Sequence, residues 1–264
     1  MLTPEPFKRV RLGHVLFHAA TEAETVSHIA NALGSQRGGT IVTVNLDHLL
    51  RCKRFVEYRA IVERADLVVA DGQPIIWASR IQGSPLPERV AGSSLCLSLA
   101  SRLALEHRSI YMLGGDPGVA EKASNTLVKR FPGLRVVGTY CPPLGFENDP
   151  AELDKIRQQL VLAQPDMVYV ALGSPKQERL IEMLKCSLPH AWWMGVGISL
   201  SFITGDVKRA PVWVQRIGCE WVHRLVQEPR RLARRYLVDG IPFAIQLLSG
   251  SALRRVRGLG SGRE

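Results

Sequence analysis

SIYMLGGDPGVAEKASNTLVKRFPGLRVVG, residues 109–138, carries the alternation that decides the fold. The apolar run Ser109–Leu113 is typical of a buried strand, and the Asp116-Pro117 pair after it marks the start of a helix over Val119–Arg130. A Phe-Pro-Gly triplet stops that helix, and a second apolar run, Leu134–Gly138, follows it. The stretch therefore predicts a strand, a crossover helix and a second strand parallel to the first.

The same alternation continues on both sides of this unit. Further short and nearly uncharged runs, expected as buried strands, are Thr40–Asn45, Leu67–Ala70, Met167–Leu172 and Ala191–Gly195. Helix signals lie between such runs, among them a capping box at Thr21 and Glu24 and a helix-starting Pro150. The pattern predicts an α/β fold with a mostly parallel, doubly wound sheet and helices on both of its faces.

Charge is the unusual part of the composition. The 264 residues carry a net charge of +10, while the hydrophobic share of 46% is ordinary for a globular protein. Surplus Lys and Arg suit a polyanionic partner, which leaves nucleic acid, an anionic bilayer and substrate phosphates open. The five cysteines form no C-x-x-C pair, which argues against a disulfide framework or a zinc site and favours a reducing compartment.

Most of the positive charge lies near the C-terminus. Residues 208–264 contain twelve Lys or Arg against four Asp or Glu. They begin with a tryptophan-bearing helix expected over Val212–Gln227 and continue past Glu228-Pro229 into the basic run PRRLARRY. We therefore divide the chain into an α/β domain, residues 1–207, and a basic helical appendage, residues 208–264.

The appendage suits a membrane surface. Arg224, Arg231 and Arg235 share one helical stripe if the helix runs straight, and such a stripe fits an anionic bilayer or a phosphate-bearing lipid head group. A merely solvated basic face is the alternative. No secretion signal is recognisable, and the longest apolar stretch, Ala191–Ile203, is shorter than the roughly 20 residues of a membrane span. We expect surface binding and no span.

Polar residues follow two of the expected strands, where ligands of parallel sheets bind. Thr43 and Asn45 end the first strand and suit hydrogen bonds to a base or sugar, although a cap of the following helix is the alternative. Asp71 follows the next strand beside Gly72, where it suits a general base or, equally, an Asp-Gly turn.

Three other stretches carry candidate ligand-binding residues. Arg89 lies in a loop before a helix, and its planar guanidinium suits a diphosphate, with an ordinary surface arginine as the alternative. Gly114 and Gly115 form a glycine-rich turn that resembles a phosphate cradle weakly. Lys176 and Gln177 fall on the first turn of a helix, near the mouth of the sheet.

Several known site patterns are absent. The sequence holds no D-x-D pair, and no G-x-x-x-x-G-K-[ST], H-E-x-x-H or G-x-S-x-G motif. His14 and His18 share a helical spacing, but without a third ligand they are expected to be structural. The sequence therefore predicts no metal site.

Eight stretches taken in order, over about residues 10–245, resemble the WecG/TagA/CpsF family of glycosyltransferases. They are TVNLDHL, ADLVVADGQPIIWASR, PLPERVAGSSL, YMLGGDPGVAEKA, FPGLRVVG, PDMVYVALGSPKQE, GVGISLSFITGDVKRAP and EWVHRLVQEPRRLARRY. The resemblance implies a Rossmann-like core and a C-terminal appendage that engages the membrane. It also implies metal-independent, inverting transfer of a sugar from a UDP-sugar to a polyprenyl-diphosphate-linked saccharide, in the synthesis of surface polysaccharide, exopolysaccharide or teichoic acid.

The resemblance also assigns roles to residues. Asp71 is expected as the general base and Arg89 as a contact of the diphosphate. The expected pocket residues are Thr43, Asn45 and Gln177. The expected contacts from the appendage, to the active site or the lipid diphosphate, are Arg224, Arg231 and Arg234. Localisation is expected in the cytoplasm, peripheral at the inner face of the cell membrane.

One position departs from the family pattern. Ser201 stands where many members have an aspartate before the phenylalanine that follows the GVG turn. Loss of the carboxylate either changes the donor sugar or is neutral, so the donor is left open between a hexose and an N-acetylhexosamine. A non-catalytic family member and a nucleotide-dependent oxidoreductase are the alternative functions. A nucleic-acid partner is disfavoured because no recognised motif occurs. The sequence is compatible with a homo-oligomer and does not define the oligomeric state.

Overall fold

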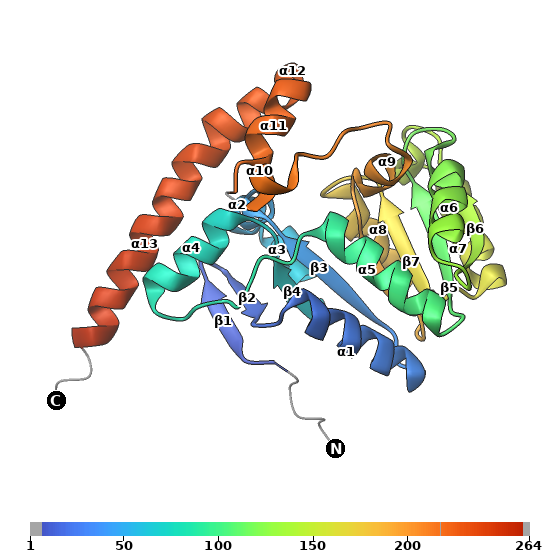
Figure 1. Ribbon diagram of the computed structural model, residues 1–264, viewed down its shortest axis with the longest axis horizontal. Coiled ribbons are helices and arrows are strands. Elements are labelled where there is room, and N and C mark those ends of the chain that lie inside the picture. The colour runs from blue at the N-terminus through green and yellow to red at the C-terminus, as the bar shows by residue number, and fades with distance from the viewer. Residues whose placement is uncertain (1–6, 217, 261–264) are drawn as a thin grey trace.

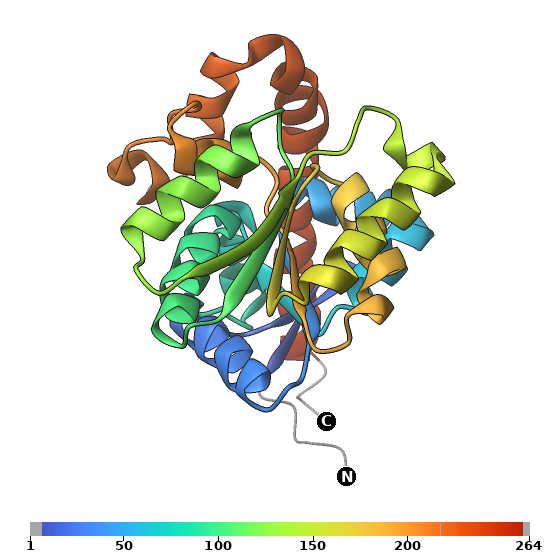
Figure 2. The same cartoon turned by 90° about the vertical axis from the view of Figure 1, so that its right-hand side faces the viewer.

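The computed structural model describes residues 7–216 and 218–260, without the side chains of Val212, Arg216, Arg231 and residues 257–260. Its centre is a six-stranded parallel sheet with helices on both faces (Figures 1 and 2). The strand order is β4-β3-β8-β7-β5-β6, and a separate hairpin is formed by β1 and β2. The strands are β1 (Arg9–Leu12), β2 (Val15–His18), β3 (Gly39–Val44), β4 (Leu67–Ala70), β5 (Ser109–Gly114), β6 (Arg135–Tyr140), β7 (Met167–Ala171) and β8 (Trp192–Gly195). The predicted α/β class and the six predicted strands of the sheet are confirmed.

The helices divide between the two faces of the sheet. One apolar core joins α1, α5, α6 and α9 to one face, and two others join α2, α3, α4, α7, α8 and α13 to the opposite face. The helices of the α/β part are α1 (Glu22–Gly34), α2 (Leu46–Arg54), α3 (Val56–Glu63), α4 (Gln73–Gln82), α5 (Gly92–Leu105), α6 (Val119–Arg130), η1 (Phe146–Asn148), α7 (Pro150–Ala163), α8 (Lys176–Leu184), η2 (Lys185–Ser187) and α9 (Ser199–Thr204). Those of the C-terminal part are α10 (Val212–Arg216), α11 (Glu220–Gln227), α12 (Pro229–Ala233), η3 (Arg234–Gly240) and α13 (Ile241–Gly260).

Both faces of the central strands are buried, which explains why their sequences carry almost no charge. On β8, Trp192 packs into the core of one face and Trp193 into that of the other, with 2% and 1% of their surfaces exposed. On β7, Tyr169 and Val168 divide in the same way because successive side chains of a strand point to opposite faces. Full burial of one such large side chain stabilises the fold by about 1.5–3 kcal/mol.

Of two predicted helix starts, one has the predicted capping residues and the other does not. The capping box of Thr21 and Glu24 is present at α1, as predicted. The Asp116-Pro117 pair does not cap α6, because the N-cap is Gly118, whose φ of +81° lets the chain turn into the helix two residues later. The predicted extent of α6 is nevertheless confirmed.

The strand order creates a crevice at the carboxyl edge of the sheet. The chain runs from β3 outward to β4, crosses to β5 and β6 at the far side, and returns through β7 to β8, which pairs with β3. Helix α2 leaves β3 toward one face, whereas α9 leaves β8 toward the other. Neighbouring strands whose connections part in this way open a ligand crevice between them.

The N-terminal hairpin was not predicted, and the helical spacing of its two histidines does not reflect a helix, although His18 has the structural role expected of it. His14 lies in the turn between β1 and β2, and His18 is the last residue of β2, so neither is helical. His18 accepts a hydrogen bond at Nδ1 from the backbone amide of Val68 at 2.9 Å. The hairpin thereby contacts β4, the edge strand of the sheet.

The C-terminal part differs from the expected single helix over Val212–Gln227. Gly218, with φ of +79°, separates α10 from α11, because a left-handed residue ends a helical run. The break at Glu228-Pro229 is confirmed, since α11 ends at Gln227 and α12 begins at Pro229. Helix α13 then runs along α4 (Figure 1), with Phe243 and Leu247 in the same apolar core as β4.

Candidate active site

Asp71 lies at the carboxyl end of β4, and its backbone is held in place. Its amide donates to the Val44 carbonyl at 2.8 Å, so the chain stays paired with β3 just beyond the strand. Its Oδ2 accepts from the amide of Gly92, the first residue of α5, at 3.2 Å. Burial raises the pKa of this carboxyl above its ordinary value, and the positive charge of Arg89 and the Gly92 amide oppose that shift without cancelling it.

Arg89 lies near the same end of β4 as Asp71. The amide of Val90 donates to the Ala70 carbonyl at 2.8 Å, which lays the loop across the end of β4 and brings Arg89 toward Asp71. The guanidinium donates from Nη1 to Glu220 Oε2 at 3.1 Å, and Glu220 belongs to α11. Arg89 therefore connects the crevice to the appendage.

Thr43 and Asn45 lie where the sequence places them, at the end of β3. Only 7% of the Thr43 surface is exposed, and a Cβ on Gly92 would come within 2.8 Å of Thr43 Oγ1. Glycine at position 92 thus allows α5 to begin directly against β3. Asn45 is the N-cap of α2, with Oδ1 accepting from the amides of Asp47 and His48 at 3.0 and 3.1 Å. Because the cap uses only the side-chain oxygen of Asn45, the side-chain NH2 group is the one that can donate to a ligand.

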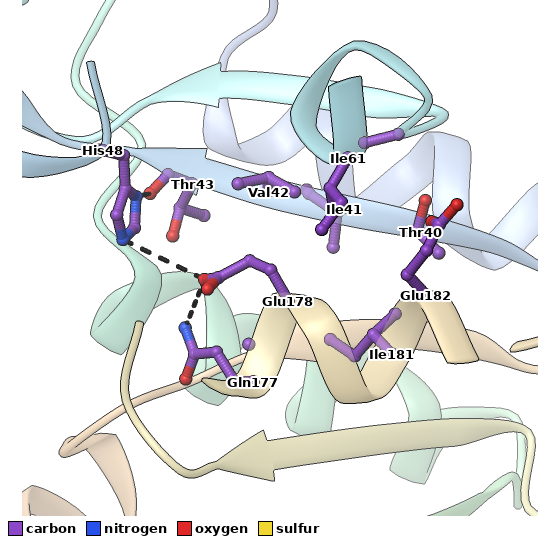
Figure 3. A pocket seen from close by; sticks show the side chains of 12 residues that line it. Thr40, Ile41, Val42, Thr43, His48, Ile61, Gln177, Glu178, Ile181 and Glu182 are labelled. Carbon is purple, nitrogen blue, oxygen red and sulfur yellow. Dashed lines mark hydrogen bonds and ion pairs between the residues drawn. The ribbon is translucent and has the colours of Figure 1, made fainter. Parts of the chain in front are cut away.

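A pocket between β3 and α8 continues the crevice (Figure 3). Gln177 accepts from the Gly197 amide at 3.1 Å and donates to Glu178 at 2.8 Å, so it ties α8 to the loop after β8. Glu178 is 3% exposed and has His48 Nε2 at 4.0 Å from Oε1, while its Oε2 has no hydrogen-bond partner among the residues that the structure describes. A buried carboxylate oxygen without a partner is costly, and such atoms concentrate where a ligand or water completes the bonding.

Gly114, Gly115 and Lys176 lie on the side of the edge formed by β5 and β7. A Cβ on Gly114 would come within 2.7 Å of the Ala171 carbonyl, so glycine is required there by strand packing. The amide of Gly115 donates to the same carbonyl at 2.8 Å and is not available to a phosphate in this arrangement. Lys176 is exposed and pairs with Glu147. The structure does not bring these three residues together with Asp71.

The arginines of the appendage occupy different positions. Arg224 is half-buried on α11, Arg234 is exposed in η3, and the side chain of Arg231 lies outside the described residues. Arg235, from the predicted stripe, pairs through Nη2 with Asp47 Oδ2 at 3.0 Å, at the start of α2. Arg209, just before α10, donates to Ser94 at 3.0 Å and pairs with Glu220 at 3.4 Å. The ion pair of Arg235 with Asp47 and the hydrogen bond of Arg209 to Ser94 hold the appendage over the carboxyl ends of β3 and β4.

Within the described part of the chain, no three His, Cys, Asp or Glu side chains gather in a way that could hold a metal ion. The site therefore consists of one carboxylate with a raised pKa, a buried polar pocket, and arginines contributed by both parts of the chain.

A family model described as "Glycosyl transferase WecG/TagA/CpsF family" matches residues 10–257. This chain belongs to the WecG/TagA/CpsF family of glycosyltransferases. A relative from Bacillus spizizenii (strain ATCC 23059 / NRRL B-14472 / W23), N-acetylglucosaminyldiphosphoundecaprenol N-acetyl-beta-D-mannosaminyltransferase, is 31% identical over 210 residues. The alignment covers 79% of this chain and 79% of the relative. The resemblance drawn from the sequence is confirmed, and the protein is a glycosyltransferase of this family.

Sequence reasoning missed several partners of the predicted residues in this WecG/TagA/CpsF member. Glu178 followed Gln177 in a quoted motif, yet nothing in the pattern indicated that it would be buried beside His48. Glu220 is 131 residues from Arg89 in sequence, so no local signal joins the two. Only the docking of the appendage brings them into contact.

Proposed function

We propose that this family member transfers a sugar from a UDP-sugar to a polyprenyl-diphosphate-linked saccharide, with inversion at the anomeric carbon and with Asp71 as the general base. The observation that carries the proposal is the position of Asp71 at the carboxyl end of β4, where the hydrogen bond from Val90 to Ala70 brings Arg89 toward it and burial raises the pKa of its carboxyl. A carboxylate with a raised pKa is a stronger base than an ordinary aspartate, and the adjacent guanidinium suits a diphosphate.

The chemistry follows from these positions. Asp71 accepts the proton of the acceptor hydroxyl while that oxygen forms its bond to the anomeric carbon. The bond from this carbon to the diphosphate oxygen breaks, and UDP leaves with the electron pair. Arg89 offsets the negative charge that develops on the leaving group, and we propose that positive side chains, rather than a metal ion, supply this stabilisation.

The name of the Bacillus spizizenii relative supports the class of both substrates. That protein is named as a transferase of N-acetylmannosamine to a diphosphoundecaprenol-linked N-acetylglucosamine. For this chain we propose a hexose or N-acetylhexosamine donor and an acceptor used in surface polysaccharide, exopolysaccharide or teichoic acid synthesis. Ser201, half-buried in α9 at the position where many members carry aspartate, is the residue we expect to distinguish donors.

The experiment is an assay of UDP release with a panel of UDP-sugars and short-chain diphosphate-linked sugar acceptors. We expect turnover with one donor, and loss of that turnover in Asp71→Asn while donor binding persists. Asp116→Asn is the matched control, because Asp116 is an exposed carboxylate after β5 at the same edge of the sheet. No turnover with any pair, together with intact donor binding, would favour the non-catalytic alternative.

The exposed face of the C-terminal helices supports a membrane partner. The run Arg234–Val256 is long and apolar enough to span a membrane by length and composition, and 11% of its most apolar window is buried. From the sequence we take Ala191–Ile203 as the longest apolar stretch and expect only a shorter one, Ile241–Leu248, within this run, which begins with two arginines. Ile241, Ile245 and Val256 lie on the exposed side of α13, opposite Phe243 and Leu247.

We propose that α13 lies on the inner face of the cell membrane. Crossing would remove Phe243 and Leu247 from the core and break the bonds from Lys53 to Gln246 and from Arg54 to Asp239, each 2.7 Å long. Anionic vesicles should bind the protein, and Ile245→Glu should weaken binding while Val128→Glu, an exposed valine on α6, leaves it unchanged. Resistance to extraction by alkaline carbonate would contradict a peripheral location.

A further inference from the structure

Glu220, the first residue of α11, holds two arginines from different parts of the chain. Its Oε2 accepts from Arg89 Nη1 at 3.1 Å, and its Oε1 lies 3.4 Å from Arg209 Nε. The three side chains are only 16–21% exposed, so these pairs are largely shielded from solvent. A second bond, from Arg209 Nη2 to Ser94 Oγ at 3.0 Å, fixes this arginine against the first turn of α5.

The negative charge of Glu220 disfavours ionisation of the neighbouring Asp71. The charge of Glu220 raises the pKa of Asp71, whereas the charge of Arg89 lowers it, so all three groups lie within electrostatic reach of one another. Two carboxylates beside one another near the catalytic edge repel. The two arginines offset this repulsion and stabilise the charged carboxylate of Glu220, because each of its oxygens faces a different guanidinium.

Two guanidiniums on the two oxygens of one anion form an arrangement that also binds phosphate oxygens. We propose that Arg89 and Arg209 form a diphosphate-binding site, which Glu220 occupies in the ligand-free protein and vacates when a diphosphate binds. The inference rests on the proposed function, and it adds Arg209 and Glu220 to the residues that act on substrate. The diphosphate is that of the nucleotide donor or of the prenyl acceptor, which share this chemistry.

Displacement of Glu220 has a consequence for the appendage. Glu220 is the residue through which α11 contacts Arg89, and the remaining ion pair described near the crevice joins Arg235 to Asp47 at 3.0 Å. When a diphosphate binds the arginines, the first turn of α11 loses its ion pair with Arg89 of the α/β part. Occupancy of the site and the position of α11 are therefore coupled, and each changes the other by the same free energy.

The test compares Glu220→Gln with Glu106→Gln. Glu106 is a matched control, because it also bridges two arginines, Arg102 at 2.8 Å and Arg108 at 3.1 Å, and it follows the other end of α5. Calorimetry would measure the affinity of each variant for UDP and for geranyl diphosphate. We expect Glu220→Gln to tighten one of the two by roughly tenfold, since the arginines no longer have a competing anion, while Glu106→Gln changes neither. The ligand that responds identifies the source of the diphosphate.

A purely structural ion pair would behave differently. In that case Glu220→Gln would leave both affinities unchanged or weaken them, and this result would overturn the inference while the proposed function stands. Arg209→Ala should weaken binding of the responsive ligand, and in that background Glu220→Gln should gain less than in the wild type. Wild-type protein that binds neither diphosphate would overturn the proposed function and the inference together.

A second measurement covers the case in which Glu220→Gln does not fold. Hydrogen exchange of the wild-type amides in α11 would be followed with and without saturating ligand. We expect exchange in α11 to become faster on binding, although ligands ordinarily slow exchange near their site. Unchanged or slower exchange across α11 would overturn the displacement of Glu220.

Discussion

Carboxylates at the amino edge of the sheet receive more hydrogen bonds than Asp71 and Glu178 at its carboxyl edge. At the amino edge, Asp66 accepts from the amide and hydroxyl of Thr40 at 2.7 and 3.0 Å. Asp166 accepts from the amide and hydroxyl of Ser109 and from Arg108, each at 2.8 Å. Hydrogen bonds to this charged group lower the pKa of Asp166 despite its partial burial. These carboxylates join neighbouring strands.

At the carboxyl edge, Asp71 and Glu178 have fewer partners than these two aspartates. Asp71 receives one backbone hydrogen bond, and burial raises its pKa. Glu178 is buried, and one of its oxygens has no partner within the described part of the chain. Among these four carboxylates, the number of hydrogen-bond partners, rather than the residue type, distinguishes the two that join strands from the two that are candidates for contact with substrate.

The largest expected difference between the edges is in turnover. Asp71→Asn should lower kcat by about 10²–10⁴-fold, because an amide cannot accept the proton of the acceptor hydroxyl. Asp166→Asn should retain kcat within about threefold, because Asp166 lies at the opposite edge. Steady-state UDP release would measure both. Comparable loss in the two variants would remove the functional distinction between the edges.

The next difference is in stability. Asp166→Asn should lower the free energy of unfolding by about 2 kcal/mol, because it weakens charged hydrogen bonds to Ser109 and Arg108. Urea unfolding would measure it, with Asp154→Asn, an exposed carboxylate on α7, as the control. Since the pKa of Asp166 is lowered in the folded state, its contribution is present at neutral pH and is lost as the pH falls below about 4. The wild type and Asp166→Asn should therefore converge in acid.

At the carboxyl edge, replacement of the aspartate is expected to change the free energy of unfolding in the opposite direction. Because the pKa of Asp71 is raised in the folded state, the ionised group disfavours folding once the pH has risen through that pKa. Asp71→Asn should therefore raise the free energy of unfolding at pH 7, within a range of about 0.5–2 kcal/mol. Urea unfolding at pH 7 would measure the gain. A loss of stability would mean that Asp71 has a structural role like that of Asp166.

The smallest effect concerns the pH profile. The acid limb of kcat/KM should have its midpoint above the ordinary range of an aspartate, because burial raises the pKa of Asp71. Glu220→Gln should move this limb to lower pH, since the charge of Glu220 contributes to the rise. Glu106→Gln should leave it in place. A limb that moves upward in Glu220→Gln would contradict the electrostatic contact between the two carboxylates.

Much of the fold was predictable because burial on both faces leaves a clear pattern. β4 and the start of β7 match the predicted runs at Leu67 and Met167, and their residues are almost uncharged because helices cover both sides. The hairpin escaped prediction because its strands, RVRL and VLFH, are only four residues each, and only RVRL alternates charged with apolar residues. The break in the appendage depended on Gly218, whose backbone conformation the helical pattern does not reveal.

The candidate site was predictable to the extent that strand ends define it. Thr43, Asn45 and Asp71 follow adjacent parallel strands, so their places at one edge follow from the alternation alone. What each side chain contacts depends on docking of distant segments. The pairing of Arg89 with Glu220 and of Asp47 with Arg235 arises only when the appendage packs over the edge, and no local sequence pattern indicates these distant pairs.

The bond from Val68 to His18 affects how copies of the chain can associate. β4 is the last strand on its side of the sheet, and exposed backbone donors on such a strand invite another chain to add a strand. Here the outward amide of Val68 is satisfied by an imidazole, and the hairpin lies alongside. Strand addition at β4 is therefore blocked, so any aggregation or ordered self-association of this protein must proceed through a surface other than this one.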